Sequence, residues 1–275
     1  MNLQETDLNA PLAAEYEFTG TTQTRFQTLF TENETSHLVE NSITEDGKAI
    51  VKVKDFTQTS DALIDVLGAD LSRVIDILKF QIGERETLEK ILNMDEVWES
   101  WQAAKARLIE KYKDIPDFGS ISDSFGDNLK NEEKLRLNIE NKGIYGLLFP
   151  QVKFTSYGRI PNEVFRTKVI REGILSKDLP MAEMVKIRRG ADDELLIEVK
   201  GELDKDKFDY AGFLNTARQM FGGHLKNDDI VFHGTENYTL DARTLDYTNG
   251  TRQHRFEIKG SYFRDERQTF KLKAD

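Results

Sequence analysis

Two periodicities divide this sequence, and their order limits the folds that the chain can adopt. Apolar and polar residues alternate with a period of two in much of 15–55 and again in 151–275, as in A-I-V-K-V-K and E-L-L-I-E-V-K. Between these stretches, 56–150 carries apolar residues at helical spacing. A period of two is typical of half-buried strands, and a period of 3.6 is typical of helices. Because the two types are segregated along the chain, we expect an α+β fold with a mostly antiparallel sheet.

The same patterns give the expected organisation of the chain. The sheet is built from N- and C-terminal strands, with a central helical block and one C-terminal helix at 206–221. Two arrangements remain open for the helical block. It is an insertion, with the N-terminal strands pairing with the C-terminal sheet, or the chain forms two independent units that meet near Pro150. The expected parts are a flexible arm at 1–14, a β segment at 15–55, the helical block at 56–150 and an antiparallel β-rich domain at 151–275.

Local signals refine the expected elements. Asp46-Gly47 and Asn249-Gly250 each lie between alternating residues, which predicts two hairpin turns. Within the helical block, apolar residues from Leu71 to Leu92 recur at helical spacing, and a longer helix is expected from about Asp95 to Lys113. The stretch D-F-G-S-I-S-D-S-F-G-D at 117–127 is rich in turn-forming residues and predicts a loop.

Composition excludes several kinds of site. The chain has 275 residues, a formal net charge of −11 and no cysteine. Without cysteine there is no disulfide, no thiolate nucleophile and no cysteine-based metal centre. The negative charge makes nucleic acid an unlikely partner, since it repels phosphate. There is neither a secretory signal nor an apolar run long enough to span a membrane, so we expect a cytoplasmic protein with no membrane partner.

One stretch carries a possible catalytic pattern. M-A-E-M-V-K-I-R-R-G-A-D-D-E-L-L-I-E-V-K-G resembles the layout of the PD-(D/E)xK nuclease superfamily. The resemblance covers about forty residues and places Glu183 as the first acid, with Glu198 and Lys200 as the second motif. Ala182-Glu183 stands where the family has Pro-Asp. The resemblance implies that the carboxylates hold Mg²⁺ and that the lysine orients the attacking water.

The same residues also fit an ordinary strand. In L-L-I-E-V-K-G, Leu195, Ile197 and Val199 share one face, and Glu198 and Lys200 share the other. R-F-E-I-K-G at 255–260 and I-V-K-V-K at 50–54 repeat the arrangement, which favours strand physics over an active site. Under this interpretation the chain has no catalytic residue, no metal and no cofactor.

Other side chains give weaker signals. The spacing of His37, His224, His233 and His254 matches no metal motif, although His224 and His233 flank a predicted strand and could meet near Asp228 or Asp229. Basic residues gather in two predicted strands, and two tryptophans in the long helix are candidates for the core. These groups are Lys186, Arg188 and Arg189, then Arg252 and Arg255, and finally Trp98 and Trp101.

Two functions from different classes follow. The first is a non-enzymatic structural or interaction subunit of a larger assembly, with virion or contractile-tail-like particles as one setting. Its partners would be other protein subunits in a homo-oligomer or a hetero-assembly, joined by edge pairing of strands. The second is the Mg²⁺-dependent nuclease described above. The sequence favours the first and leaves open whether the chain is an enzyme.

Overall fold

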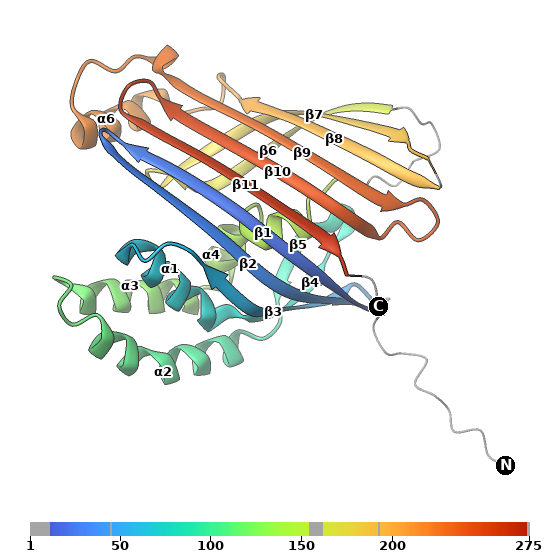
Figure 1. The fold of residues 1–275 in the computed structure, drawn as a ribbon, viewed down its shortest axis with the longest axis horizontal. Helices are drawn as coiled ribbons and strands as arrows, with labels where there is room; N and C mark the ends of the chain where they lie inside the picture. The colour runs from blue at the N-terminus through green and yellow to red at the C-terminus, as the bar shows by residue number, and fades with distance from the viewer. Residues whose placement is uncertain (1–11, 45, 154–161, 192, 274–275) are drawn as a thin grey trace.

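In the part of the chain that the structure describes, eleven strands form a single antiparallel sheet (Figure 1). The computed structural model describes residues 12–44, 46–153, 162–191 and 193–273. Most of the predicted arm at 1–14 lies outside these residues. The strand order is β5-β4-β3-β2-β1-β11-β10-β9-β8-β7-β6. The strands are β1 (Leu12–Phe26), β2 (Leu29–Ile43), β3 (Lys48–Gln58), β4 (Ile77–Ile82), β5 (Leu88–Ile91), β6 (Asn162–Ile174), β7 (Lys177–Arg189), β8 (Glu194–Leu203), β9 (Ile230–Asp241), β10 (Tyr247–Ile258) and β11 (Tyr262–Leu272).

Helices fill the inside of the sheet and one of its ends. The first five come from the middle of the chain, and the last follows β8. They are α1 (Leu63–Ser72), α2 (Met94–Lys111), α3 (Phe118–Lys130), α4 (Glu132–Ile139), α5 (Gly143–Leu148) and α6 (Tyr210–Phe221). The prediction of an α+β fold with a mostly antiparallel sheet is therefore confirmed. No helix among the described residues is both long and apolar enough to cross a membrane.

The N-terminal and C-terminal strands belong to the same sheet. β1 pairs with β2 on one side and with β11 on the other, from Tyr16 opposite Leu272 to Phe26 opposite Tyr262. This pairing joins the N-terminal strands β1–β5 and the C-terminal strands β6–β11 into one sheet, and the segment that contains α1–α5 lies between them in the sequence. The predicted hairpin at Asp46-Gly47 joins β2 to β3.

Three local predictions were wrong. The segment read as helical from Leu71 to Leu92 contains β4 and β5, in which Leu78 and Phe80 alternate with polar residues and bury their side chains. All of the predicted loop at 117–127 except Asp117 lies within α3. Asn249-Gly250 is not a turn but lies inside β10, next to a register shift. Gly250 is needed there because a Cβ would lie 2.3 Å from the Phe270 ring.

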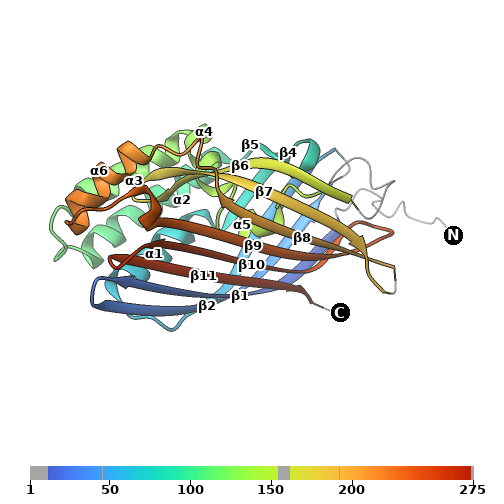
Figure 2. The same cartoon turned by 90° about the horizontal axis from the view of Figure 1, so that it is seen from above.

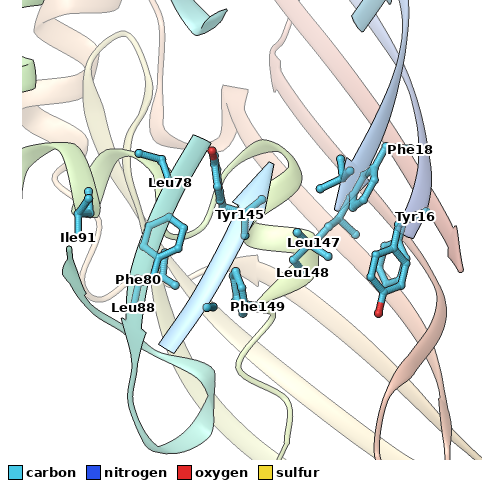
Figure 3. Close-up of a cluster of buried hydrophobic side chains, with 14 of the residues drawn as sticks. Tyr16, Phe18, Leu78, Phe80, Leu88, Ile91, Tyr145, Leu147, Leu148 and Phe149 are labelled. Atoms are coloured by element: carbon cyan, nitrogen blue, oxygen red, sulfur yellow. The ribbon is translucent and has the colours of Figure 1, made fainter. Parts of the chain in front are cut away.

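The sheet is curled, so that distant strands face each other across its inside (Figure 2). Lys168 on β6 forms an ion pair with Glu236 on β9, three strands away. On the other side, the Tyr247 hydroxyl of β10 donates to Glu86, between β4 and β5, at 2.7 Å. The helix α5 lies within this curl, where Tyr145 and Phe149 pack against Phe80 of β4 (Figure 3).

Two apolar clusters fill the inner face. The larger one joins α1–α5 to β1–β5 and to one end of β7–β11, and Trp101 of α2 is almost fully buried in it. The smaller one lies under α6, where Phe213 packs against Phe208 and Phe256. Burying each large apolar side chain contributes about 1.5–3 kcal/mol, so these clusters supply most of the favourable free energy of folding.

Candidate functional site

The structure separates the residues of the nuclease hypothesis. Glu198 and Lys200 lie on the outer face of β8 and form an exposed ion pair at 2.8 Å. Glu183 lies on β7 opposite Gly201, with its side chain on the inner face. Residues directly opposite in a sheet share a face, so Glu183 cannot join the other two. The nuclease hypothesis requires Glu183, Glu198 and Lys200 to converge, and the structure does not bring Glu183 together with the other two.

Glu183 has a partner of its own, whereas Glu198 and Lys200 pair with each other. The Arg166 guanidinium donates to the Glu183 carboxylate at 2.7 Å, and this buried ion pair links β6 to β7. Lys200 lowers the pKa of the Glu198 carboxyl, first through their hydrogen bond and then through its charge. Within the described ranges, no group of three or more His, Asp or Glu side chains could hold a metal ion.

The other candidates are also distributed over different surfaces. His233 and Asp228 line one surface depression with Tyr210, and His224 is not among its lining residues. Lys186 and Arg255 lie on the outer face, where Lys186 pairs with Glu163 and Arg255 lies over the Phe263 ring. Trp101 is a core residue, and Trp98 packs against the larger cluster. The two basic strands therefore form no common patch.

A group of charged residues, hereafter the charged belt, crosses the inner face between the two apolar clusters. Glu236 lies at its centre, with Lys168 and His254 each 3.6 Å away. Arg252 donates to the Gly143 carbonyl at 2.8 Å and to the Gln268 side chain at 2.5 Å. The belt comprises Arg166, Lys168, Glu183, Glu236, Arg252, His254, Arg264 and Glu266.

In the charged belt, burial and neighbouring charges shift the pKa values of Glu236 and His254 in opposite directions. Burial raises the pKa of the Glu236 carboxyl, but the charges of Lys168 and Arg252 outweigh it and the pKa lies below its usual value. Burial lowers the pKa of His254, despite the nearby Glu236. His254 is therefore neutral at neutral pH, and Glu236 is ionised.

The sequence contained a signal for the belt that our sequence analysis missed. In I-V-F-H-G-T-E-N-Y-T-L, Glu236 has the same parity as Ile230, Phe232, Tyr238 and Leu240, which are core residues. On β10, Arg252 and His254 share the parity of Phe256 and Ile258. A charged residue that alternates in phase with the core residues of its strand is expected to be buried, which indicates a buried ion pair or a functional site.

The open edge of the sheet is the second feature that could bind a partner. β6 is the last strand in the sheet order. Val169 lies opposite Pro180, whose nitrogen carries no hydrogen and whose carbonyl accepts from Asp204 on the β8 side. This pair is therefore not hydrogen bonded, and the main-chain groups of Val169 point away from β7. By the same alternation, those of Glu163, Phe165 and Thr167 point away too.

The free edge of β6 is covered only in part by the described residues. Asn141, between α4 and α5, donates to the Val169 carbonyl at 3.0 Å. Further along the strand, Phe165 is 78% exposed. Beside Phe165, an open groove of about 780 Å³ includes Ala182 and Met184 of β7 and Lys200 and Glu202 of β8. The edge at 163–167 and this groove, hereafter the β6 site, form the best candidate for a contact surface.

Comparisons with known proteins indicate the fold alone. No family model matches the chain, and no curated protein matches it in sequence. A solved structure titled "Lipid-protein interactions in lipovitellin" resembles it with a TM-score of 0.51 and 10% sequence identity, over 95% of this chain. The match covers 25% of the lipovitellin chain, so this chain spans about a quarter of that protein's length. The likeness to this part of lipovitellin concerns the course of the backbone.

Proposed function

We propose that this chain is a non-enzymatic subunit of a protein assembly, and that it self-associates by pairing two copies through the β6 site. The observation that carries the proposal is the exposed Phe165 on a strand whose outward main-chain groups meet no strand of the described chain. A free strand edge readily pairs with the edge of another chain. The Mg²⁺-dependent nuclease is not carried forward, because Glu183 lies on the face opposite Glu198 and Lys200.

A second copy fits this edge by a two-fold axis through Phe165. In that register Phe165 lies opposite Phe165 of the second copy, and Glu163 lies opposite Thr167. Cross-strand aromatic pairs stabilise antiparallel sheets, and no like charges face each other in this register. The register ends before Val169, whose carbonyl Asn141 already occupies. The contact therefore uses the uncovered part of the edge.

The groove beside Phe165 supports the same occupant. Its floor and walls are apolar around Ala182 and Met184, and its far side carries Lys200 and Glu202, which have opposite charges. A surface with both signs of charge can complement a copy of itself related by a two-fold axis. The net charge of −11 disfavours unspecific association of two copies, so a specific apolar contact is needed. We place such an assembly in the cytoplasm or within a virion or contractile-tail-like particle.

The test is light scattering over a concentration series with the full chain and two matched variants. Phe165→Lys adds a charge at the centre of the site, and we expect it to weaken self-association about 100-fold, as for a central interface residue. Phe30→Lys is the control, because Phe30 is 53% exposed on β2, in the other half of the sheet. We expect this control to associate like the unmodified chain.

The outcomes separate the possibilities. A wild-type chain that stays monomeric at all concentrations would overturn self-pairing through β6. An oligomer that Phe30→Lys disrupts and Phe165→Lys leaves intact would place the interface elsewhere and also contradict the proposal. Thermal melting of both variants checks that the fold is kept, which we expect because both side chains are exposed.

A further inference from the structure

A groove lies between the end of α1 and the middle of α2. Arg73–Ile75 form a single 3₁₀ turn directly after α1, and side chains of this turn and of α2 line the groove. Its volume is about 270 Å³. Val74 is its buried lining residue, and Ser100, Ala103 and Ala104 leave space on the side of α2 because their side chains are small. This space is hereafter the α1–α2 groove.

Two arginines and one aspartate carry the charges that line the α1–α2 groove. Arg107 lines it from α2, and no residue in the described part of the chain forms an ion pair or a hydrogen bond with its side chain. Arg73 is 55% exposed and lies 3.6 Å from the Asp70 carboxylate. That carboxylate also accepts hydrogen bonds from Lys111 at 2.5 Å and from the Tyr112 hydroxyl at 2.7 Å. Asp70 is thus shared between two cations, and Arg107 has no counterion there.

The balance of charge at the groove is positive. Burial raises the pKa of the Asp70 carboxyl, but the hydrogen bonds from Lys111 and Tyr112 outweigh it, and the pKa lies below its usual value. Asp70 is therefore ionised at neutral pH and offsets one of the two lining arginines. Behind the lining, Lys111 adds one positive charge and Asp76, which acts on Arg73, adds one negative charge. One positive charge remains in excess.

Other carboxylates of α2 do not line the α1–α2 groove. Glu96 pairs with Lys79 at 2.6 Å, and Glu110 pairs with Lys113 at 2.7 Å. Their charges are therefore already matched by lysines outside the groove. In a chain with a net charge of −11, an arginine-lined groove without a matching set of carboxylates is a local site for an anion.

The donors of the groove suit a phosphate group. A guanidinium offers a planar fork of N–H donors that matches phosphate oxygens in pairs. Ser100 and Arg107 lie two turns apart on the same face of α2, and the long arginine stem leans toward the start of the helix. With Arg73 on the opposite wall, three donor groups converge on one space. A phosphate monoester has three terminal oxygens to accept from them, whereas a carboxylate has only two.

The size of the groove favours a phosphate that carries an organic group. One water needs only about 10–15 Å³ measured in the same way, so inorganic phosphate is far smaller than about 270 Å³. The rest of the surface is apolar, with Val74, Ala103 and Ala104. An alkyl group that covers this surface gains about 0.8 kcal/mol for each buried methylene.

We infer that the α1–α2 groove binds a small phosphate monoester. The phosphate lies between the Arg73 and Arg107 guanidinium groups and accepts from the Ser100 hydroxyl. The organic group lies against Val74 and Ala103. The groove shares no residue with the β6 site, so the inference does not depend on self-association.

The experiment is a calorimetric titration of the full chain with propyl phosphate, with 1-propanol, inorganic phosphate and propionate as matched probes. We expect saturable binding of propyl phosphate and none of 1-propanol. Inorganic phosphate lacks the apolar contact and propionate lacks the third oxygen. Each should therefore bind at least about tenfold more weakly than propyl phosphate.

Two pairs of variants locate the site. Arg107→Gln should weaken propyl phosphate binding at least about tenfold, because it removes a charged donor. Its control is Lys105→Gln, which removes the same charge from the same helix but lies beside Asp123 of α3. Ala103→Glu places a carboxylate in the groove and should abolish binding, whereas Ala106→Glu, also exposed on α2 but not lining the groove, should not. Thermal melting verifies that each variant is folded.

Several results would overturn the inference. They are no saturable binding of propyl phosphate, unchanged affinity in folded Arg107→Gln, and an equal loss in Lys105→Gln. A loss in Ala106→Glu as large as in Ala103→Glu would place the binding outside the groove. Inorganic phosphate or propionate that binds as tightly as propyl phosphate would show an unspecific anion site, and the ligand class that we infer would be wrong.

Discussion

At one edge of the sheet, side chains of α4 form hydrogen bonds with the outward main-chain groups of β5, whereas at the other edge the residues that the structure describes cover β6 at one position, Val169. Glu132 accepts a hydrogen bond from the Ile91 nitrogen at 2.8 Å, and Arg136 donates to the Leu88 carbonyl at 2.9 Å. β5 is also short, with four residues against thirteen in β6. On β6, Asn141 reaches the Val169 carbonyl.

The difference shows that one short segment treats the two edges unequally. Within residues 132–141, Glu132 and Arg136 contact β5, and Asn141 contacts β6. One segment reaches both edges because the sheet curls until β5 and β6 lie on either side of α4. Natural sheets cover their edges to prevent unwanted pairing. The β5 edge is covered in this way, whereas the described residues leave the β6 edge open at 163–167. The open edge is therefore more consistent with a contact surface than with an edge that the fold merely leaves unprotected.

Opening the covered edge tests this comparison with the largest expected change in stability. Glu132→Ala leaves the buried nitrogen of Ile91 without its acceptor and removes the carboxylate beside Arg136. We expect the free energy of unfolding to fall by about 2 kcal/mol. Urea denaturation measures it. Glu133→Ala is the matched control, because it lies exposed in the same first turn and shares the interaction with the helix dipole.

A loss in Glu133→Ala equal to that in Glu132→Ala would show that the effect comes from the helix terminus and not from the edge. If Glu132→Ala also self-associates when Phe165→Lys is present, the β5 edge becomes a contact surface once it is uncovered. That outcome would show that α4 prevents pairing at β5.

The long strands could be predicted from the sequence because their alternation is a local signal. A-I-V-K-V-K and E-L-L-I-E-V-K belong to β3 and β8, and the Asp46-Gly47 turn joins β2 to β3. β4 was missed because I-L-K-F-Q-I lies among apolar residues that also fit a helical spacing. The helix α3 was missed because its glycines suggest a loop. Gly126 is nevertheless required there, since a Cβ would lie 2.5 Å from Trp101 Nε1.

The candidate sites depend on contacts that the sequence does not contain. Lys168 and Glu236 are 68 positions apart and meet only because the sheet curls over three strands. The Asn141 contact with Val169 depends on where α4 ends relative to the edge of β6. In contrast, the opposite faces of Glu183 and Glu198 were within reach of a register argument, because hairpin pairing fixes which residues share a face.

A smaller change in stability is expected at the partly covered edge. Asn141→Ala removes the hydrogen bond to the Val169 carbonyl, and we expect the free energy of unfolding to fall by about 1.5 kcal/mol. It also lengthens the free part of β6, so self-association should become tighter. Urea denaturation and light scattering measure the two effects. Two results would contradict a covering role for Asn141. They are tighter self-association of the unmodified chain than of Asn141→Ala, and no self-association of the variant.

The smallest effect concerns Asp76, which lies directly before β4 on the covered side of the sheet. Its carbonyl accepts from the Val53 nitrogen, and burial raises the pKa of its carboxyl to about 6, against which the charge of Arg73 acts. A carboxyl whose pKa is raised on folding favours the folded state below its unfolded pKa of about 4, and this contribution is lost as the pH rises through about 6. Stability should therefore fall between about pH 4 and pH 6 at this group.

Asp76→Asn removes the charge and keeps the shape, so it should stabilise the protein at pH 8 and change little at pH 4. Two units of pKa correspond to nearly 3 kcal/mol, and partial exposure to solvent reduces the expected gain to about 1 kcal/mol. Urea denaturation at pH 4 and pH 8 measures the difference, with exposed Asp95→Asn as the control. An equal gain at both pH values would mean that the amide acts through a new hydrogen bond. In that case the covered side of the sheet would carry no buried charge at Asp76.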